Sequence, residues 1–152
     1  MRILILEDDI LQFEVLQDNL NVRFPNSQIT RIMTAKAFKE EIDRPDAILP
    51  DIILIDVLVP WQAVGEPEWP KPPEAVDRKV GIYCAGLVAA HPKTRKIPVI
   101  VYTELDRQSR YGKEPSLEEE IRELPKHFHY MRKDASLSDL NHLIWTLTRR
   151  KR

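Results

Sequence analysis

A short run of evenly apolar residues, 52–55, constrains the fold of this chain more than any other feature of its sequence. The run is too short to span a membrane, and it lacks the apolar and polar alternation of a strand with one face in water. We therefore predict a parallel strand that is covered on both faces. The run ends in Asp56. Because open α/β sheets bind ligands outside the carboxyl ends of their strands, Asp56 is the first candidate for chemistry.

A second run of this kind, residues 3–6, is followed by the three acids Glu7, Asp8 and Asp9. Asp9 is expected to cap the next helix. Glu7 and Asp8 are expected at the same sheet edge as Asp56, where converging carboxylates need a cation to offset their repulsion. Oxygen-only ligands suit Mg²⁺, so the sequence predicts a magnesium site at this edge.

Helical and strand-like segments alternate along most of the chain. The expected strands are residues 3–6, 28–34, 52–55, 97–103 and 128–131. The expected helices are residues 10–24, 35–44, 79–91, one capped by Ser116 that runs to about Leu124, and one capped by Ser136 with an apolar stripe from Leu137 to Leu147. In this reading Thr103 ends the fourth strand and Lys133 follows the fifth.

Residues 60–77 interrupt the alternation, because they hold five prolines and two tryptophans and resist both helix and strand. We predict a long loop here. One interpretation is a surface insertion that the fold tolerates, since long loops cost little additional closure entropy. The other is a stiff, tryptophan-bearing lid or partner-docking surface beside the acid cluster.

Length and composition limit the remaining classes of function. A chain of 152 residues predicts one domain, and 23 basic against 24 acidic residues leave no net field that would favour nucleic acid or an anionic membrane. The single cysteine, Cys84, cannot form an internal disulfide and indicates a reducing compartment. With no signal peptide and no apolar run of membrane-spanning length, we expect a soluble cytoplasmic protein.

Each of the candidate residues stands at the end of an expected strand: first the acids Glu7 and Asp8, then Asp56, Thr103 and Lys133. With these residues in this order, the chain resembles the receiver domain of two-component response regulators. The resemblance covers essentially the whole chain. It implies an α/β fold of the flavodoxin-like, doubly wound type: five parallel strands in a (βα)5 arrangement with strand order 2-1-3-4-5. It also implies a single receiver domain over residues 1–152, with the insertion at about 60–77 and no output domain after it.

The resemblance implies a role for each of the site residues. Asp56 would be the phosphoacceptor. Glu7 and Asp8 would hold Mg²⁺ together with Asp56 and the backbone carbonyl of Leu58, with Asp8 the more direct ligand.

Three residues further along the chain complete the implied site. Thr103 would bond the phosphoryl group, Lys133 would pair with it, and Tyr130 would be the aromatic switch residue that moves together with Thr103. One position departs from the family pattern, because Glu104 follows Thr103 where receivers usually have a small residue.

The function implied is a stand-alone response regulator that takes a phosphoryl group from a sensor histidine kinase or phosphotransfer protein and then alters a surface read by a downstream protein. It would catalyse only its own phosphorylation and dephosphorylation, without contacting nucleic acid or membrane, and a homodimer is left open. One alternative is a receiver-like interaction module that is not phosphorylated in the cell. Another, a Mg²⁺-dependent phosphatase, would need an acid two residues after the nucleophile, where this chain has Leu58.

Overall fold

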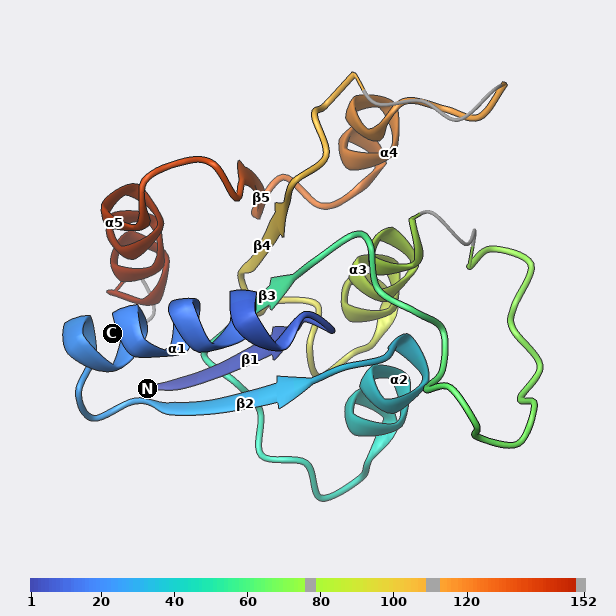
Figure 1. Ribbon diagram of the computed structural model, residues 1–152, viewed down its shortest axis with the longest axis horizontal. Helices are drawn as coiled ribbons and strands as arrows, with labels where there is room; N and C mark the ends of the chain where they lie inside the picture. Colours follow the sequence, from blue (N-terminus) through green and yellow to red (C-terminus); the bar gives the residue numbers. More distant parts are fainter. Residues whose placement is uncertain (76–78, 109–112, 150–152) are drawn as a thin grey trace.

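The structure is a computed structural model, and it describes residues 1–75, 79–108 and 113–149. Strands and helices alternate as the sequence predicted (Figure 1). The strands are β1 (Arg2–Leu6), β2 (Gln28–Ile32), β3 (Ile52–Ile55), β4 (Val99–Thr103) and β5 (Phe128–Arg132). The helices are α1 (Ile10–Arg23), α2 (Ala35–Asp43), α3 (Val80–Ala90), α4 (Leu117–Glu123) and α5 (Leu137–Arg149). None of the described helices is long and apolar enough to cross a membrane.

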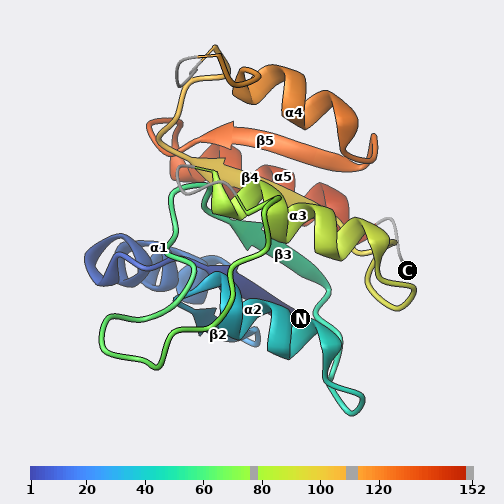
Figure 2. The ribbon, with the colours of Figure 1, turned by 90° about the vertical axis from the view of Figure 1, so that its right-hand side faces the viewer.

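All five strands form one parallel sheet in the order β2-β1-β3-β4-β5, which confirms the predicted topology. Helices cover both faces of this sheet (Figures 1 and 2). One apolar cluster joins side chains of the sheet to α1 and α5, and includes Ile5, Leu54, Leu20 and Ile144. The other joins the opposite side chains to α2 and α3, and includes Leu6, Ile55, Phe38 and Val88. Burial on both faces explains why the central strands are evenly apolar.

Side chains that precede the helices satisfy the free N–H groups at their first turns. Asp9 accepts hydrogen bonds from the N–H groups of Leu11 and Gln12, as predicted, and so starts α1 directly after the acid pair. Ser116 and Glu119 form the capping box expected for α4. The predicted strand 28–34 ends early, at Ile32, because Thr34 is the cap of α2.

Backbone hydrogen bonds beyond the strand ends align the residues that follow them. The N–H of Glu7 donates to the Ile32 carbonyl at 2.9 Å, and the N–H of Asp56 donates to the Leu6 carbonyl at 2.9 Å. Within the sheet Leu6 is paired with Ile55, which places Glu7 beside Asp56 at the carboxyl edge. The N–H of Lys133 similarly donates to the Thr103 carbonyl at 2.9 Å.

The proline-rich insertion is a loop, as predicted, and the structure describes it up to Ala75; its last two residues, 76 and 77, lie outside the described residues. The carbonyls of Pro60 and Trp61 accept the first two N–H groups of α2, at 3.0 and 2.8 Å. Figure 2 shows the later part of the loop passing in front of α2. The insertion therefore helps to cap a helix of the domain.

The two tryptophans of the insertion differ in exposure. Trp61 is 8% exposed, lies edge-on to Tyr83 and donates its indole N–H to the Trp69 carbonyl at 3.3 Å. Trp69 is 57% exposed, with the ammonium of Lys36 at 5.2 Å from its ring centroid. One tryptophan thus anchors the loop to the core, and the other lies at the surface.

Candidate functional site

Three carboxylates meet at the carboxyl edge of the sheet, where β1 and β3 end. Glu7 and Asp56 are 3% and 7% exposed, and Asp8 is exposed. One carboxylate oxygen from each residue lies within 4.8 Å of the others. The structure thus brings together the three acids that the sequence predicted to converge.

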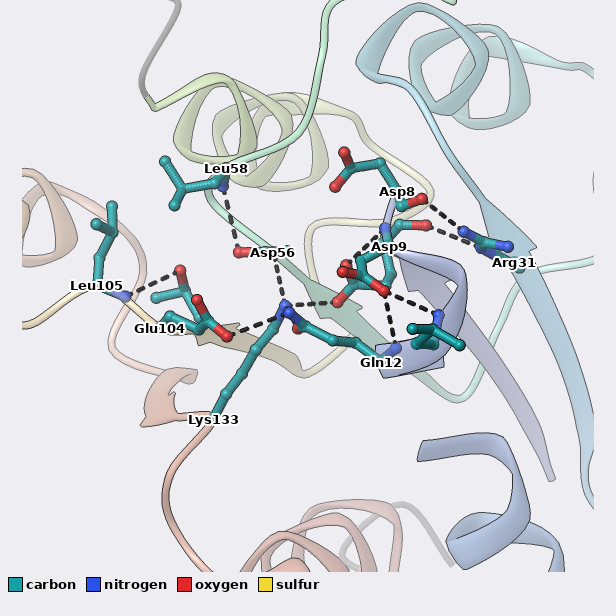
Figure 3. A network of polar contacts seen from close by, with 12 residues as sticks. Asp8, Asp9, Gln12, Arg31, Asp56, Leu58, Glu104, Leu105 and Lys133 are labelled. Carbon is teal, nitrogen blue, oxygen red and sulfur yellow. Dashed lines mark hydrogen bonds and ion pairs between the residues drawn. The ribbon is translucent and has the colours of Figure 1, made fainter. Parts of the chain in front are cut away.

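Lys133, which directly follows β5, reaches across this edge to the acids (Figure 3). Its ammonium nitrogen lies 2.6 Å from Glu7 Oε2 and 2.6 Å from Asp56 Oδ2. It also donates to the side-chain oxygen of Gln12. The four neighbouring charged groups (Glu7, Asp8, Asp56 and Lys133) carry more negative than positive charge, which favours the binding of a further cation.

Burial and charge change the acidity of these groups. Burial raises the pKa of Glu7, although its hydrogen bond to Lys133 lowers that pKa in part. Partial loss of water around the Asp8 carboxylate raises its pKa as well, and the nearby charge of Asp56 adds to the increase. Burial lowers the pKa of Lys133, but the carboxylates of Asp56 and Glu7 outweigh it and leave that pKa above its usual value. Lys133 is therefore held as a cation among the acids.

Arg31, on β2, holds the backbone of the two acids that follow β1. Its Nε donates to the Glu7 carbonyl at 2.9 Å, and its Nη2 donates to the Asp8 carbonyl at 2.7 Å. Its guanidinium also lies 5.0 Å from the ring centroid of Phe13. Sequence reasoning missed Arg31, because a single arginine in a weak strand pattern carries no local signal for such a contact.

Thr103 and Tyr130 both bond the peptide groups of Leu105, on opposite sides of that residue. The buried Thr103 hydroxyl oxygen accepts from the Leu105 N–H at 3.4 Å. The half-buried Tyr130 donates its hydroxyl to the Leu105 carbonyl at 2.6 Å, and the Arg107 guanidinium lies 4.7 Å from its ring centroid. The two predicted switch residues are therefore linked through one residue of the loop after β4.

Leu58 lies next to the central aspartate, and its N–H donates to Asp56 Oδ1 at 3.2 Å. Both carboxylate oxygens of Asp56 therefore have a partner, because Oδ2 contacts Lys133. The metal-binding role expected for the Leu58 carbonyl stays a prediction.

Gly81, in the first turn of α3, packs directly against the backbone of Asp56. A Cβ atom on Gly81 would lie 2.0 Å from the Asp56 carbonyl oxygen. The N–H of Gly81 donates to the Val57 carbonyl at 3.0 Å. This approach places α3 against the end of β3, and sequence analysis missed it because the intervening insertion separates the two segments along the chain.

No protein-family model and no curated protein matches the chain, whereas many solved structures do. The receiver domain of a sensor histidine kinase from Pseudomonas aeruginosa PAO1, solved with magnesium coordinated in its active site cleft, gives a TM-score of 0.69 at 16% identity, covering 97% of this chain and 96% of that one. The response regulatory domain of protein mrkE from Klebsiella pneumoniae gives 0.68 at 16% identity, covering 99% and 97%.

A third match is the signal receiver domain of a histidine kinase from Syntrophus aciditrophicus, with a TM-score of 0.68 at 22% identity, covering 97% of this chain and 89% of that one. These likenesses extend over nearly the whole chain. They show that the chain has the fold of response regulator receiver domains.

Proposed function

We propose that this chain, which has the receiver-domain fold, is a response regulator receiver that accepts a phosphoryl group on Asp56 in a Mg²⁺-dependent reaction. One observation carries the proposal: the buried Asp56 carboxylate lies 2.6 Å from the Lys133 ammonium and beside the carboxylates of Glu7 and Asp8. A nucleophile, a fixed cation and two further oxygen ligands are therefore gathered at one sheet edge. These are the groups that phosphoryl transfer to a carboxylate needs.

The donor set fits a magnesium ion, because every side chain in it offers oxygen. Glu7, Asp8 and Asp56, with the backbone carbonyl of Leu58, would hold the ion. When bound, it supplies positive charge that offsets the repulsion between an attacking carboxylate and an anionic phosphoryl group. Arg31 keeps the backbone of Glu7 and Asp8 in place for this role.

In the proposed reaction, a carboxylate oxygen of Asp56 attacks the phosphorus of a phosphohistidine on a sensor histidine kinase or phosphotransfer protein. The new O–P bond forms as the P–N bond breaks, and the imidazole nitrogen keeps the electron pair and takes up a proton. Lys133 neutralises charge on the transferred oxygens, and the Thr103 hydroxyl donates a hydrogen bond to one of them. The protein thus positions and neutralises, and it modifies only itself.

The phosphoryl group would change the protein surface through Thr103. An acyl phosphate adds roughly −1.5 to −2 of charge if it resembles other phosphorylated side chains. If Thr103 turns toward the new oxygens, its hydroxyl gives up the hydrogen bond from the Leu105 N–H. The carbonyl of Leu105 accepts the hydrogen bond of the Tyr130 hydroxyl, so a shift of Leu105 would disturb that bond too. Tyr130 is then free to move, and the surface of β5 and its neighbouring helices changes for a downstream protein.

A second candidate function is a receiver-like interaction module that is not phosphorylated in the cell. The exposed Trp69 of the insertion and Trp145 of α5, which is 39% exposed, favour it as surface aromatic groups suited to protein contact. Metal dependence separates the two functions, because constitutive binding through these tryptophans needs no Mg²⁺.

Tryptophan fluorescence during titration with Mg²⁺ and then beryllofluoride, a phosphoryl mimic, tests the proposal. We expect a saturable Mg²⁺ response followed by a further beryllofluoride change. Asp56→Asn should abolish phosphoryl uptake from a donor, measured by intact mass, while the folded-state circular dichroism is unchanged. Phosphoryl uptake that survives in Asp56→Asn would contradict the site assignment.

A further inference from the structure

Gln12, in the first turn of α1, connects the site lysine to an acid on the rim of the site (Figure 3). Its side-chain oxygen accepts from the Lys133 ammonium, and its side-chain nitrogen donates to Glu104 Oε1 at 3.1 Å. Glu104 and Lys133 also line the same cavity, which has a volume of about 410 Å³. The exposed carboxylate of Glu104 is therefore held near the site by a hydrogen bond from another element.

A held carboxylate at this position adds a negative charge beside the site. Glu7, Asp8 and Asp56 carry two more charges than Lys133 offsets, and a bound Mg²⁺ would balance those two, so the charge of Glu104 stays uncompensated. The proposed substrate of the site is a phosphoryl anion, which that charge repels. Charges on the surface raise or lower the local concentration of a charged reactant, and the effect falls as salt screens it. A glutamate free to extend into water would be screened more effectively than one that Gln12 retains at the cavity.

We propose that Glu104, positioned by Gln12, is a specificity-determining residue that disfavours phosphoryl donors in proportion to their negative charge. This inference rests on the proposed function of Asp56. A small, doubly charged donor meets the full repulsion of Glu104. A protein donor can place a basic side chain against the Glu104 carboxylate, and such a donor is the partner that this rim fits.

Two small donors of different charge test the inference. Acetyl phosphate is a dianion at neutral pH, and phosphoramidate carries one net negative charge. With acetyl phosphate, Asp56 forms an O–P bond as the bond to the acetyl oxygen breaks and acetate leaves with the electron pair. With phosphoramidate, the P–N bond breaks and ammonia leaves, its nitrogen already protonated.

The variant is Glu104→Gln, which removes the charge and keeps a side chain able to hydrogen-bond Gln12. The rate of phosphoryl uptake is followed by intact mass in the presence of Mg²⁺. At low salt we expect Glu104→Gln to accelerate uptake from acetyl phosphate by about tenfold and from phosphoramidate by about threefold. Added salt should reduce both gains, because it screens exposed charges.

Glu14→Gln is the matched control, since Glu14 is an exposed acid of the same helix as Gln12 and its replacement changes the net charge equally. We expect uptake by Glu14→Gln to equal that of the unchanged protein with both donors. Thermal unfolding of each variant confirms that it is folded before rates are compared.

The outcomes separate the two proposals. If neither the unchanged protein nor Glu104→Gln is phosphorylated by either donor, the proposed function is wrong, and this inference with it. If the unchanged protein and Glu104→Gln are phosphorylated at equal rates, only the role of Glu104 is wrong. If Glu104→Gln accelerated phosphoryl uptake equally with both donors and independently of salt, the role of the Glu104 charge would also be wrong, because the side chain would then act through its size.

Discussion

At the scale of single residues, the site depends on the cationic side chains that contact the acids as much as on the acids themselves. Lys133 contacts the carboxylates of Glu7 and Asp56. Arg31 contacts the carbonyls of Glu7 and Asp8. A cation on each side of β1 therefore fixes both the side chain and the backbone of Glu7. Outer partners of this kind orient metal ligands and influence affinity.

Replacement of Arg31 tests its positioning role. We expect Arg31→Gln to weaken Mg²⁺ binding by about tenfold, because the carbonyls of Glu7 and Asp8 lose the two donors that hold them. The measurement is a fluorescence or calorimetric Mg²⁺ titration. Arg95→Gln is the control, since this exposed arginine precedes β4 and so lies toward the other edge of the sheet. Equal Mg²⁺ affinities for the two variants would contradict the role.

At the scale of elements, α3 and the insertion before it determine how β3 presents Asp56. The carbonyls of Pro60 and Trp61 bond the start of α2, so the chain leaving β3 is fixed soon after the site. The buried Lys79 ammonium, just before α3, pairs with Glu120 of α4 at 3.0 Å. These contacts tie α3 to its neighbours while Gly81 meets the backbone of Asp56.

The close approach of α3 to β3 predicts a large cost for a single methyl group. Gly81→Ala should lower the free energy of unfolding by about 3 kcal/mol, because its Cβ would clash with the Asp56 carbonyl oxygen and force α3 away from the site. Denaturant unfolding measures the change. Because α3 is displaced at Asp56, the beryllofluoride response should also be reduced.

Gly86 provides the control within the same helix, because a Cβ there meets no atom within 4 Å. Gly86→Ala should stabilise the protein by about 0.5–1 kcal/mol through the better helix propensity of alanine. If Gly81→Ala and Gly86→Ala lost similar stability, the clash at Gly81 would not be the cause of the loss, and the prediction would be wrong.

At the scale of the whole molecule, two apolar layers enclose one sheet, and its central strands are inaccessible to water. Cys84, on α3, is fully buried within the layer formed with α2. Burial raises the pKa of its thiol to about 12. The cysteine therefore acts as a small apolar group of the core, in agreement with the absence of any partner for a disulfide within the chain.

The burial of Cys84 makes it a probe of global unfolding. Since the thiolate is the reactive form, iodoacetamide should leave Cys84 unmodified in the native protein at mildly alkaline pH and modify it completely in denaturant. Mass spectrometry measures the modified fraction. Rapid modification of the native protein would show that the α2–α3 layer opens locally, without unfolding of the sheet.

The sequence by itself determined the order of the elements and the residues at the strand ends. Buried parallel strands require continuous apolar runs, so the positions of Glu7, Asp8, Asp56 and Thr103 follow from local pattern. Because the strands are parallel, their carboxyl ends lie at one edge of the sheet, which brings those acids to the same edge. Lys133 could be placed after the last strand in the same way, although its contacts with Glu7 and Asp56 could not.

Only the tertiary structure decided which side chains support those residues. The contacts of Arg31 with the carbonyls after β1 depend on β2 lying next to β1. The Gln12–Glu104 hydrogen bond joins α1 to the loop after β4, and Gly81 meets Asp56 from beyond a long insertion. Such contacts arise from the packing of distant segments against one another. No periodicity or local spacing encodes them, because the pattern around one partner carries no information about the other.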